Sequence, residues 1–275
     1  MRKSILITGC STGIGYVCAH ALHQRGYFVI ASCRKPEDVE RLKSEGLTSI
    51  QLDLSHPESI SRAVEETLKL TGGKLDALFN NGAYGQPGAL EDLPTDGLRE
   101  QFETNFFGWH QLVCELLPTM RQQGHGRIVQ NSSVLGFAAM KYRGAYNASK
   151  FAIEGWTDTL RLELMDSDIH ISLIEPGPIE TEFRANALLA FQRWITIEGS
   201  AHQAQYQQQM ARLDSDTSNN AFVLPPESCI APLIHALESP NPKIRYRITK
   251  PTKVFAVLKR LLPTALLDQI LRRAA

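Results

Sequence analysis

The sequence lacks an excess of either charge. Its 29 Lys and Arg residues balance 29 Asp and Glu residues, so the formal net charge of the 275 residues is zero. Without a basic surplus there is no chain-wide field to attract nucleic acid, and no basic stripe interleaved with aromatic residues appears. We therefore expect no nucleic-acid partner and look for function in local motifs.

Cysteine is also scarce, and long apolar runs are missing. The five cysteines are scattered, with no C-x-x-C pair and no Cys/His cluster, so we predict no metal site and a reducing, cytoplasmic setting. No stretch approaches the length of a membrane-spanning helix. Residues 1–3 lead directly into a short apolar strand, without the apolar segment and cleavage site of a secretory signal.

What the sequence does contain is an alternation of short apolar runs with longer amphipathic segments. The strand candidates are residues 4–8, 28–31, 50–52, 77–79, 128–130 and 171–174. Helical patterns fill the gaps, and polar caps predict helix starts near Pro57 and Thr95. Parallel strands need such long return connections. The sequence predicts one α/β domain over residues 1–275, a doubly wound parallel sheet with helices on both faces.

Two segments depart from this alternation. At about 182–224 the pattern weakens into apolar clusters, a Gln-rich stretch at 203–209 and a polar tract at 214–220, which we interpret as an insertion. At about 252–273 the chain is amphipathic and is interrupted by Pro263. This second segment either associates weakly with a membrane or covers the substrate mouth, or, as the pattern favours, packs on its own domain or on a partner subunit.

A Gly-rich loop follows the first strand candidate. Residues 8–15 read T-G-C-S-T-G-I-G. A loop between a strand and a helix presents unpaired N–H groups to phosphate, and glycine permits close backbone approach. The spacing differs from the commoner G-x-G-x-x-G fingerprint. In isolation, an ordinary tight turn explains it equally well.

A basic pair, Arg34 and Lys35, follows the second strand candidate, where a dinucleotide-binding fold meets the adenosine ribose. No Asp or Glu stands there to accept bonds from a ribose 2′-hydroxyl. Arg can make charge-assisted contacts with a 2′-phosphate instead. This favours NADP(H) over NAD(H). The alternative is that both residues are solvated charges before the next helix.

Tyr146 and Lys150 form a Y-x-x-x-K pair in a segment expected to be helical from about Gly144, so they share one helix face. A nearby ammonium lowers the pKa of a tyrosine from its ordinary value of about 10. Tyr146 could then act as general acid or base. The pattern alone arises often by chance, but Ser133, after the fifth strand candidate, offers a hydroxyl for a substrate oxygen.

In motif order and spacing, the chain resembles the short-chain dehydrogenase/reductase family over nearly its whole length. The matches are the glycine motif at 8–15, Asn105 in N-F-F-G, Ser133, Tyr146 with Lys150, and Pro176 with Gly177. The resemblance implies a Rossmann domain that transfers hydride between a nicotinamide cofactor and a carbonyl or alcohol. It also implies a catalytic tetrad: Tyr146 donates the proton, Lys150 binds the nicotinamide ribose and lowers the tyrosine pKa, Ser133 orients the carbonyl, and Asn105 holds a relay water.

The resemblance further implies a set of cofactor-binding residues. They are Gly9, Ser11, Thr12, Gly13, Ile14, Gly15, Arg34, Asp53, Leu54, Asn81, Tyr146, Lys150, Pro176, Gly177, Ile179 and Thr181. Taken singly, Asn105, Ser133 and Asp53 fit ordinary structural roles equally well. One departure concerns residues 80–83, which read N-N-G-A where the family usually has N-N-A-G. If Ala83 needed a positive φ it would be strained, so either the turn differs or Gly82 has taken over that freedom.

Within the family the chain looks most like 17β-hydroxysteroid and retinol dehydrogenases and bacterial NADPH-dependent aldehyde reductases. The apolar residues after Pro176 and Gly177 suit an apolar substrate, unless they only pack a surface helix onto the core. They are Phe183, Leu188, Leu189, Phe191, Trp194 and Ile195. We predict an NADP(H)-dependent carbonyl reductase or alcohol dehydrogenase that forms homo-oligomers. The alternatives are an NAD-linked alcohol dehydrogenase and a nonenzymatic redox sensor.

Overall fold

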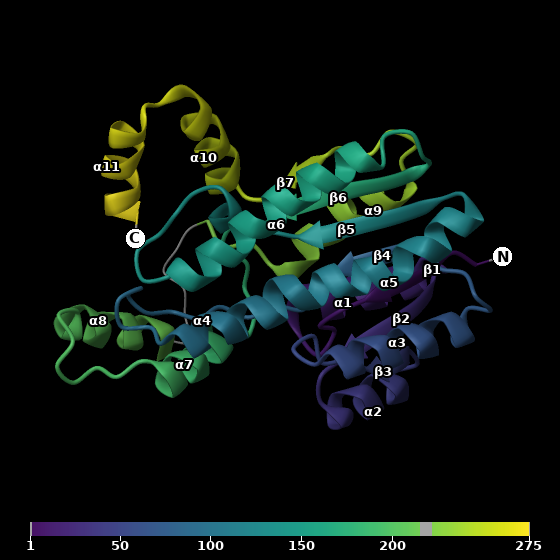
Figure 1. Cartoon of the computed structure of the whole chain (residues 1–275), viewed down its shortest axis with the longest axis horizontal. Coiled ribbons are helices and arrows are strands. Elements are labelled where there is room, and N and C mark those ends of the chain that lie inside the picture. The colour runs from purple at the N-terminus through teal and green to yellow at the C-terminus, as the bar shows by residue number, and fades with distance from the viewer. Residues whose placement is uncertain (1, 215–221, 275) are drawn as a thin grey trace.

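The strand candidates all form strands of one parallel sheet in the computed structural model, which describes residues 2–214 and 222–274 (Figure 1). The strands are β1 (Ser4–Ile7), β2 (Phe28–Cys33), β3 (Thr48–Gln51), β4 (Ala77–Asn80), β5 (Gly126–Asn131), β6 (Ile169–Glu175) and β7 (Arg245–Arg247). Their order is β3-β2-β1-β4-β5-β6-β7. This order reverses between β1 and β4 and confirms the predicted doubly wound α/β fold.

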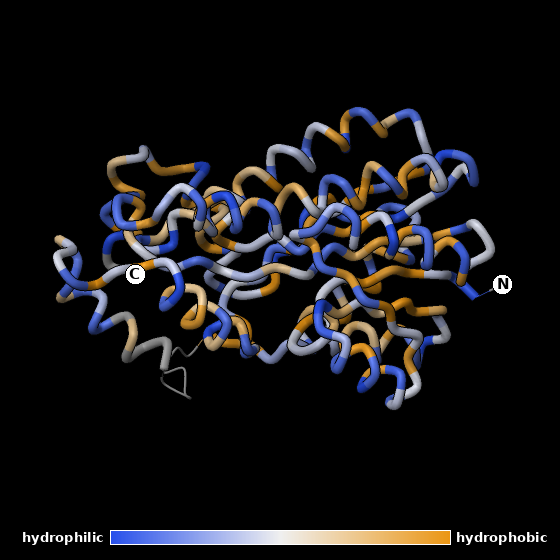
Figure 2. Tube along the Cα trace, turned by 60° about the horizontal axis from the view of Figure 1, so that its bottom comes forward, coloured by the Kyte–Doolittle hydropathy of each residue, from blue (hydrophilic) through white to orange (hydrophobic). Residues whose placement is uncertain are grey.

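Helices cover both faces of the sheet and bury its apolar strands. One layer consists of α1 (Gly13–Gln24), α2 (Pro36–Ser44) and α9 (Ile230–Glu238), which pack in one hydrophobic cluster. The other consists of α3 (Pro57–Leu70), α5 (Gly108–Gln123) and α6 (Gly144–Glu163). Figure 2 shows the hydrophobic segments concentrated along the strands between these layers. Burial on both faces explains why the strands are continuous apolar runs.

The helix that follows the β4 loop contains a π turn. α4 (Thr95–Phe102) begins at the expected residue, and η1 (Glu103–Phe107) joins it to α5. A π turn inserts one residue into a helix and is frequent at functional sites. Asn105 lies in this turn and is fully buried.

Two helices lie within the predicted insertion. α7 (Phe183–Trp194) packs against α8 (Gln203–Asp214), with the rings of Phe191 and Tyr206 5.1 Å apart. The polar tract predicted at 214–220 lies outside the described residues, apart from Asp214. The chain resumes before η3 (Pro226–Cys229), a 3₁₀ turn that leads into α9.

The C-terminal segment forms a pair of helices, α10 (Lys250–Leu261) and α11 (Thr264–Ala274). They are separated at Pro263, which interrupts the pattern as expected because proline cannot continue the hydrogen-bonded helix. In the ranges that the structure describes, no helix is both long and apolar enough to cross a membrane.

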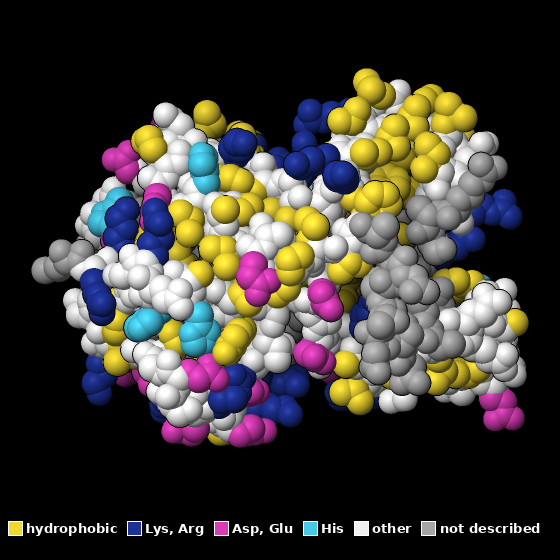
Figure 3. All heavy atoms as spheres, turned by 180° about the vertical axis from the view of Figure 1, so that it is seen from behind, with side chains coloured by type: hydrophobic (Ala, Val, Ile, Leu, Met, Phe, Trp, Pro, Cys, Tyr) yellow, Lys and Arg dark blue, Asp and Glu magenta, His cyan; other side chains and the backbone are white. Residues whose placement is uncertain are grey.

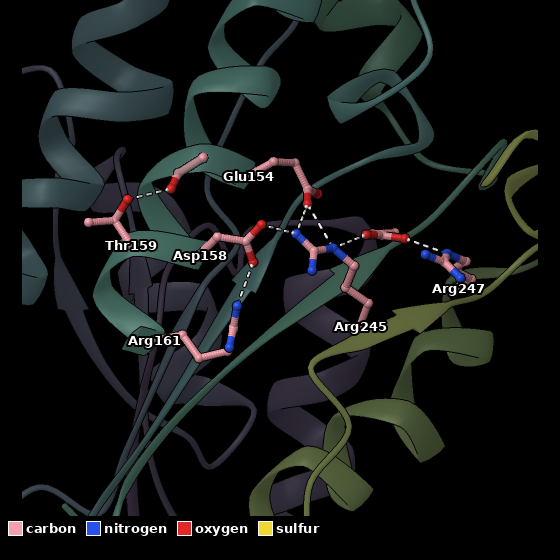
Figure 4. Close-up of polar contacts among 8 residues, drawn as sticks. Glu154, Asp158, Thr159, Arg161, Arg245 and Arg247 are labelled. Atoms are coloured by element: carbon pink, nitrogen blue, oxygen red, sulfur yellow. Dashed lines mark hydrogen bonds and ion pairs between the residues drawn. The ribbon is translucent and has the colours of Figure 1, made fainter. Parts of the chain in front are cut away.

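The strand β7 was not predicted, because its sequence is Arg-Tyr-Arg rather than an apolar run. Ion pairs hold it against its neighbours (Figure 4). Arg245 lies 3.0 Å from Glu154 and 2.7 Å from Asp158, both on α6, and 3.0 Å from Glu175 on β6. Arg247 is also 3.0 Å from Glu175. We call these five residues the β7 ion cluster.

The β7 ion cluster is costly to bury. The side chain of Glu175 is only 1% exposed, and burial raises its pKa to about 7. Burial also raises the pKa of Glu154, against the opposing effects of Ser132 and Arg245. Buried carboxylates of this kind are tolerated only while their cationic partners are in place. The arginines of β7 therefore stabilise the sheet edge chiefly by compensating the charge of α6 and β6.

Candidate active site

The predicted site residues gather at one edge of the sheet, because all its strands are parallel and their carboxyl ends meet there. The Gly-rich loop follows β1, Arg34 follows β2 and Asp53 follows β3. Asn81 follows β4, Ser133 follows β5 and Pro176 follows β6. The crevice expected at the switch point between β1 and β4 thus has these residues around it.

The Gly-rich loop requires glycine for its own packing. Gly9 and Gly13 have φ values of 68° and 60°, in the left-handed region that favours glycine. A Cβ on Gly9 would lie 2.5 Å from the Cα of Gly82, and one on Gly15 would meet the carbonyl oxygen of Gly9. Thr12 precedes α1, and in the described structure its side chain makes no capping bond. The first N–H groups of α1 are therefore available to an anion.

Residues 80–83 pose no strain. Gly82 and Ala83 are both absent from the positive-φ residues of the described chain, so the exchange of Gly and Ala costs nothing in backbone conformation. Gly82 is needed instead for its close approach to Gly9, where a Cβ on Gly82 would lie 3.2 Å from the Gly9 nitrogen. The turn therefore differs from the first expectation, and Gly82 contributes its small size rather than its conformational freedom.

Asn81 bridges three strand ends. Its Nδ2 donates to the carbonyl oxygens of Thr8 and Gly9 at 3.0 and 3.1 Å, and its Oδ1 accepts from Nδ2 of Asn131 at 2.8 Å. The hydroxyl of Thr8 accepts from the backbone N–H of Asn81 at 2.8 Å. The side chain of Asn81 thus positions the Gly-rich loop, while its contact with a cofactor stays a prediction.

The residues after β2 and β3 differ in the hydrogen bonds and ion pairs that their side chains make. Arg34 is exposed, and its guanidinium makes no hydrogen bond or ion pair within the described part of the chain. Lys35 lies 3.9 Å from Glu37. Asp53 accepts from the backbone N–H and the hydroxyl of Ser55 at 3.0 and 2.7 Å, which favours its strand-ending role. Arg34 is therefore the available cation beside the crevice.

Arg41, on α2, also touches the Gly-rich loop, and the sequence analysis missed it. Its Nη2 donates to the carbonyl oxygen of Ser11 at 2.7 Å, and it pairs with Asp38 and Glu45 on its own helix or just beyond it. Nothing in the sequence distinguishes this arginine from an ordinary surface residue of a helix. It braces the loop from the side.

Lys150 is buried and held from two sides. Its Nζ donates to the carbonyl oxygen of Asn131 at 2.7 Å and lies 4.3 Å above the centre of the Trp109 ring. The same nitrogen is 5.7 Å from the centre of the Tyr146 ring. Burial lowers the pKa of Lys150 to about 7, although the charge of Glu154 opposes this. Asn131 and Trp109 were not predicted, since their contacts depend on the fold.

Tyr146 corrects one expectation. The pKa of Tyr146 is raised to about 12 by burial, while the bond with Ser133 and the charge of Arg143 oppose the rise. The net pKa is therefore raised rather than lowered as expected, because burial outweighs the bond with Ser133 and the charge of Arg143. Ser133 also accepts from the Leu135 N–H at 3.1 Å, at the start of η2 (Val134–Gly136). The structure thus brings the Ser133 and Tyr146 hydroxyls together, with the phenol protonated at neutral pH.

Asn105 holds the loop after β4. Its Oδ1 accepts from the Tyr84 N–H at 3.1 Å, and its Nδ2 donates to the Tyr84 carbonyl at 2.9 Å and to the Ser149 hydroxyl at 3.2 Å. The Ser149 hydroxyl in turn donates to the backbone carbonyl of Tyr146. Asn105 therefore links this loop to α6, and its implied role with a relay water stays a prediction.

The loop after β6 meets the Gly-rich loop. A Cβ on Gly13 would lie 2.9 Å from Cγ2 of Thr181, and one on Gly177 would meet the hydroxyl of Thr249. The carbonyl of Pro176 accepts from the Val134 N–H at 2.8 Å, next to Ser133. Ile179 packs on the core. The two loops thus contact each other at the carboxyl edge of the sheet.

The apolar residues of α7 divide between the two interpretations. The ring of Phe183 lies 5.3 Å from that of Tyr146, edge to face, so it borders the Tyr146 side chain. Phe191 and Ile195 are buried in a cluster with Ala89 and Tyr206. For those two residues, the packing interpretation is right. Phe183, by contrast, packs on the Tyr146 ring and is positioned to contact a substrate there.

Sequence comparison places known oxidoreductases beside this chain. The model of the short chain dehydrogenase family matches residues 3–190. The uncharacterized oxidoreductase YbbO of Escherichia coli K12 is 44% identical over 99% of this chain and 95% of its own length. Human retinol dehydrogenase 8 is 39% identical over 68% of this chain and 62% of its own. The 3-ketodihydrosphingosine reductase of Bacteroides thetaiotaomicron is 30% identical over 98% and 96%.

Solved structures share the fold. A short-chain dehydrogenase from Streptomyces avermitilis superposes with a TM-score of 0.78 at 26% identity, over 98% of this chain and 93% of its own. A Burkholderia phymatum protein in complex with NAD gives 0.77 at 22% identity, over 94% and 92%. ElxO with NADP bound gives 0.73 at 23% identity, over 90% and 97%. The last two likenesses bear on the fold alone.

Proposed function

This chain belongs to the short-chain dehydrogenase/reductase family of oxidoreductases, and we propose that it transfers hydride between NADP(H) and an apolar aldehyde or ketone, or the corresponding alcohol. In this proposal Tyr146 is the general acid/base. The observation that carries it is the meeting of the Tyr146 and Ser133 hydroxyls beside the buried Lys150, at the carboxyl end of β5.

The catalytic step follows from what these side chains can do. When bound, the reduced nicotinamide would supply hydride to the carbonyl carbon. Ser133 would hold the substrate oxygen, and Tyr146 would donate its phenolic proton to that oxygen as negative charge develops there. With a pKa of about 12 the phenol carries a proton at neutral pH, but it is a weaker acid than a group whose pKa lies near neutrality. Alcohol oxidation would use the same groups in reverse.

The residues at the crevice fit a phosphate-rich dinucleotide. The glycines leave no room for a Cβ, and the first N–H groups of α1 carry no side-chain cap. One structure with a similar fold contains NADP and another contains NAD, so the likeness does not choose between them. Arg34, exposed and without a hydrogen-bonded partner in the described chain, supports NADP(H).

The substrate class rests on the surroundings of Tyr146. Phe183 lies edge to face against its ring, and Phe183 also closes on Gly85, where a Cβ would lie 2.6 Å from the ring. These apolar surfaces favour an uncharged substrate. Two relatives are named for retinol and for 3-ketodihydrosphingosine, both lipids with a large hydrocarbon part. An apolar carbonyl compound is the substrate class that these observations support.

The proposal is tested by following nicotinamide absorbance with purified protein and a panel of aldehydes, retinal and ketosteroids. We expect turnover with NADPH that exceeds turnover with NADH at equal concentration. Faster turnover with NADH would favour the NAD-linked dehydrogenase. NADPH binding without turnover of any panel member would contradict the proposal and favour a redox sensor.

Arg34→Asp is expected to reverse the cofactor preference. Loss of a charge-assisted contact with the 2′-phosphate costs roughly 1.5–3 kcal/mol, which corresponds to roughly a 10- to 100-fold rise in KM for NADPH. The KM for NADH should fall or stay unchanged, since a new carboxylate can accept from the ribose hydroxyl. Lys35→Asp is the matched control, because Lys35 already has Glu37 as a partner. Equal effects of both substitutions would show that Arg34 is not the selector.

A further inference from the structure

The C-terminal helices form a hairpin that is anchored beside the active site. Thr252 and Ala256 of α10 are buried, and the hydroxyl of Thr249 accepts from the N–H of Thr252 to cap the helix. Thr249 and Thr252 pack against Gly177, in the loop after β6. On α6, Phe151 lies 4.8 Å from Nζ of Lys259. One side of α10 is therefore packed against the loop after β6 and against α6.

The other side of this hairpin is apolar and exposed. Figure 1 shows α10 and α11 extending beyond the β7 edge of the sheet. The exposed fractions are 53% for Val254, 53% for Val257, 73% for Leu261, 49% for Leu266 and 38% for Ile270. Val254, Val257 and Leu261 are three and four residues apart and so share one face of α10, away from the buried Thr252 and Ala256. In Figure 3 hydrophobic side chains gather over this part of the molecule, with Lys and Arg beside them.

The hairpin also concentrates positive charge in a chain whose net charge is zero. Residues 250–273 contain Lys250, Lys253, Lys259, Arg260, Arg272 and Arg273 against one acid, Asp268. Lys253 and Arg260 are exposed and border the apolar stripe of α10. An apolar stripe bordered by basic residues is typical of helices that lie in the interface of an anionic membrane.

The positive charge of the hairpin distinguishes the two occupants that its apolar face could have, a second copy of the chain or a lipid surface. A second copy related by a twofold axis would place the same basic residues of both chains at one interface, where they repel. An anionic lipid surface would instead neutralise them, at roughly 1 kcal/mol for each basic residue near the surface. Charge complementarity therefore favours lipid.

We propose that α10 and α11 dock on an anionic lipid surface and hold the active site against it. The hairpin lies on the surface with the face of Val254, Val257, Leu261, Leu266 and Ile270 in the lipid. The opposite, buried side of α10 abuts η2, the turn that follows Ser133, so docking through the exposed face brings the site close to the lipid surface. An apolar substrate then passes from the bilayer to the site; this last step rests on the proposed function, whereas the docking does not.

Flotation with vesicles tests the docking. We expect the protein to float with vesicles of phosphatidylcholine mixed with phosphatidylglycerol, and to float much less with phosphatidylcholine alone or at high salt. The double variant Val257→Asp with Leu261→Asp should lower the partition coefficient by at least about tenfold, since the new charges face the lipid. Leu162→Asp with Met165→Asp is the matched control, because both residues are exposed and apolar but lie at and just beyond the C-terminal end of α6.

Charge-reversal variants measure the electrostatic contribution to vesicle binding. Lys253→Glu with Arg260→Glu should lower flotation with the anionic vesicles by about tenfold or more, whereas Lys69→Glu with Lys74→Glu, on another surface, should not. Failure of the wild-type protein to float, or equal losses in variants and controls, would overturn the proposal. So would a change from dimer to monomer in the Val257/Leu261 variant with unchanged flotation, which would assign the face to a second copy.

A water-soluble aldehyde separates this proposal from the proposed function. The hairpin variants should keep wild-type turnover of such an aldehyde in vesicle-free buffer, since none of the substituted residues borders Tyr146. Flotation without turnover of any carbonyl would leave the docking standing and remove the proposed function. Turnover without flotation would do the reverse.

Discussion

Replacement of Tyr146 by Phe is expected to lower kcat for carbonyl reduction by about 10³-fold or more, because general acid catalysis typically contributes 10²–10⁴-fold. The variant loses only the hydroxyl that stands beside Ser133 and keeps the ring that packs on Phe183. Binding of NADPH, measured by fluorescence titration, and the free energy of unfolding should change little.

The control for this substitution is Tyr27→Phe. Tyr27 also loses a hydroxyl, but its partner is Glu238, at the opposite end of the strands from the crevice. Its turnover should match the wild-type protein. If Tyr146→Phe kept turnover within tenfold of the wild type, another group would have to deliver the proton, and the assignment of Tyr146 would fail.

Arg245→Met is expected to lower the free energy of unfolding by about 3 kcal/mol or more, because removing one partner of a buried ion cluster leaves the remaining charges uncompensated. Arg245 faces three carboxylates, those of Glu154, Asp158 and Glu175, and the Glu175 side chain is almost fully buried. Urea denaturation measures the loss. Arg99→Met is the matched control, since its single partner, Asp96, is exposed and such pairs contribute about 0–1 kcal/mol.

The same loss should depend on pH. Glu175 has its pKa raised to about 7 in the folded protein, above the ordinary value of 4.5. Between these values the folded state holds a proton that the unfolded state has released, so rising pH weakens folding through this group. Without Arg245 the ionised carboxylates are penalised further. The deficit of Arg245→Met should therefore be largest above about pH 7 and shrink toward about pH 5. An equal deficit at both pH values would contradict this account.

Local patterns were enough to predict β1 to β6, because each is a short apolar run that the sheet buries on both faces. They failed for β7, whose Arg-Tyr-Arg sequence makes sense only beside the carboxylates of α6 and β6. The start of α4 at Thr95 was also predicted from the sequence, but the π turn at Asn105 was not. It depends on Tyr84 in the loop after β4, which is distant in sequence.

In the candidate site, too, the residues in local motifs could be predicted, whereas the contacts between distant segments could not. Tyr146 and Lys150 could be found because they are neighbours in one helix, and the Gly-rich loop because its glycines are contiguous. The raised pKa of Tyr146 could not be found, since burial is a property of the folded chain. The contacts of Trp109 with Lys150 and of Arg41 with Ser11 could likewise not be predicted from the sequence. The roles of the tetrad, the choice of NADP(H), the homo-oligomer and the cytoplasmic location stay predictions.

The position of β7 in the chain also bears on the order in which the protein matures on the ribosome. Glu154, Asp158 and Glu175 are synthesised roughly 70 to 90 residues before Arg245, and domains generally fold as units during synthesis. Until β7 leaves the exit tunnel, the nascent sheet ends at β6 and the three acids lack Arg245 as their common partner. α6, which carries two of these acids, therefore gains the support of Arg245 only after β7 has been synthesised.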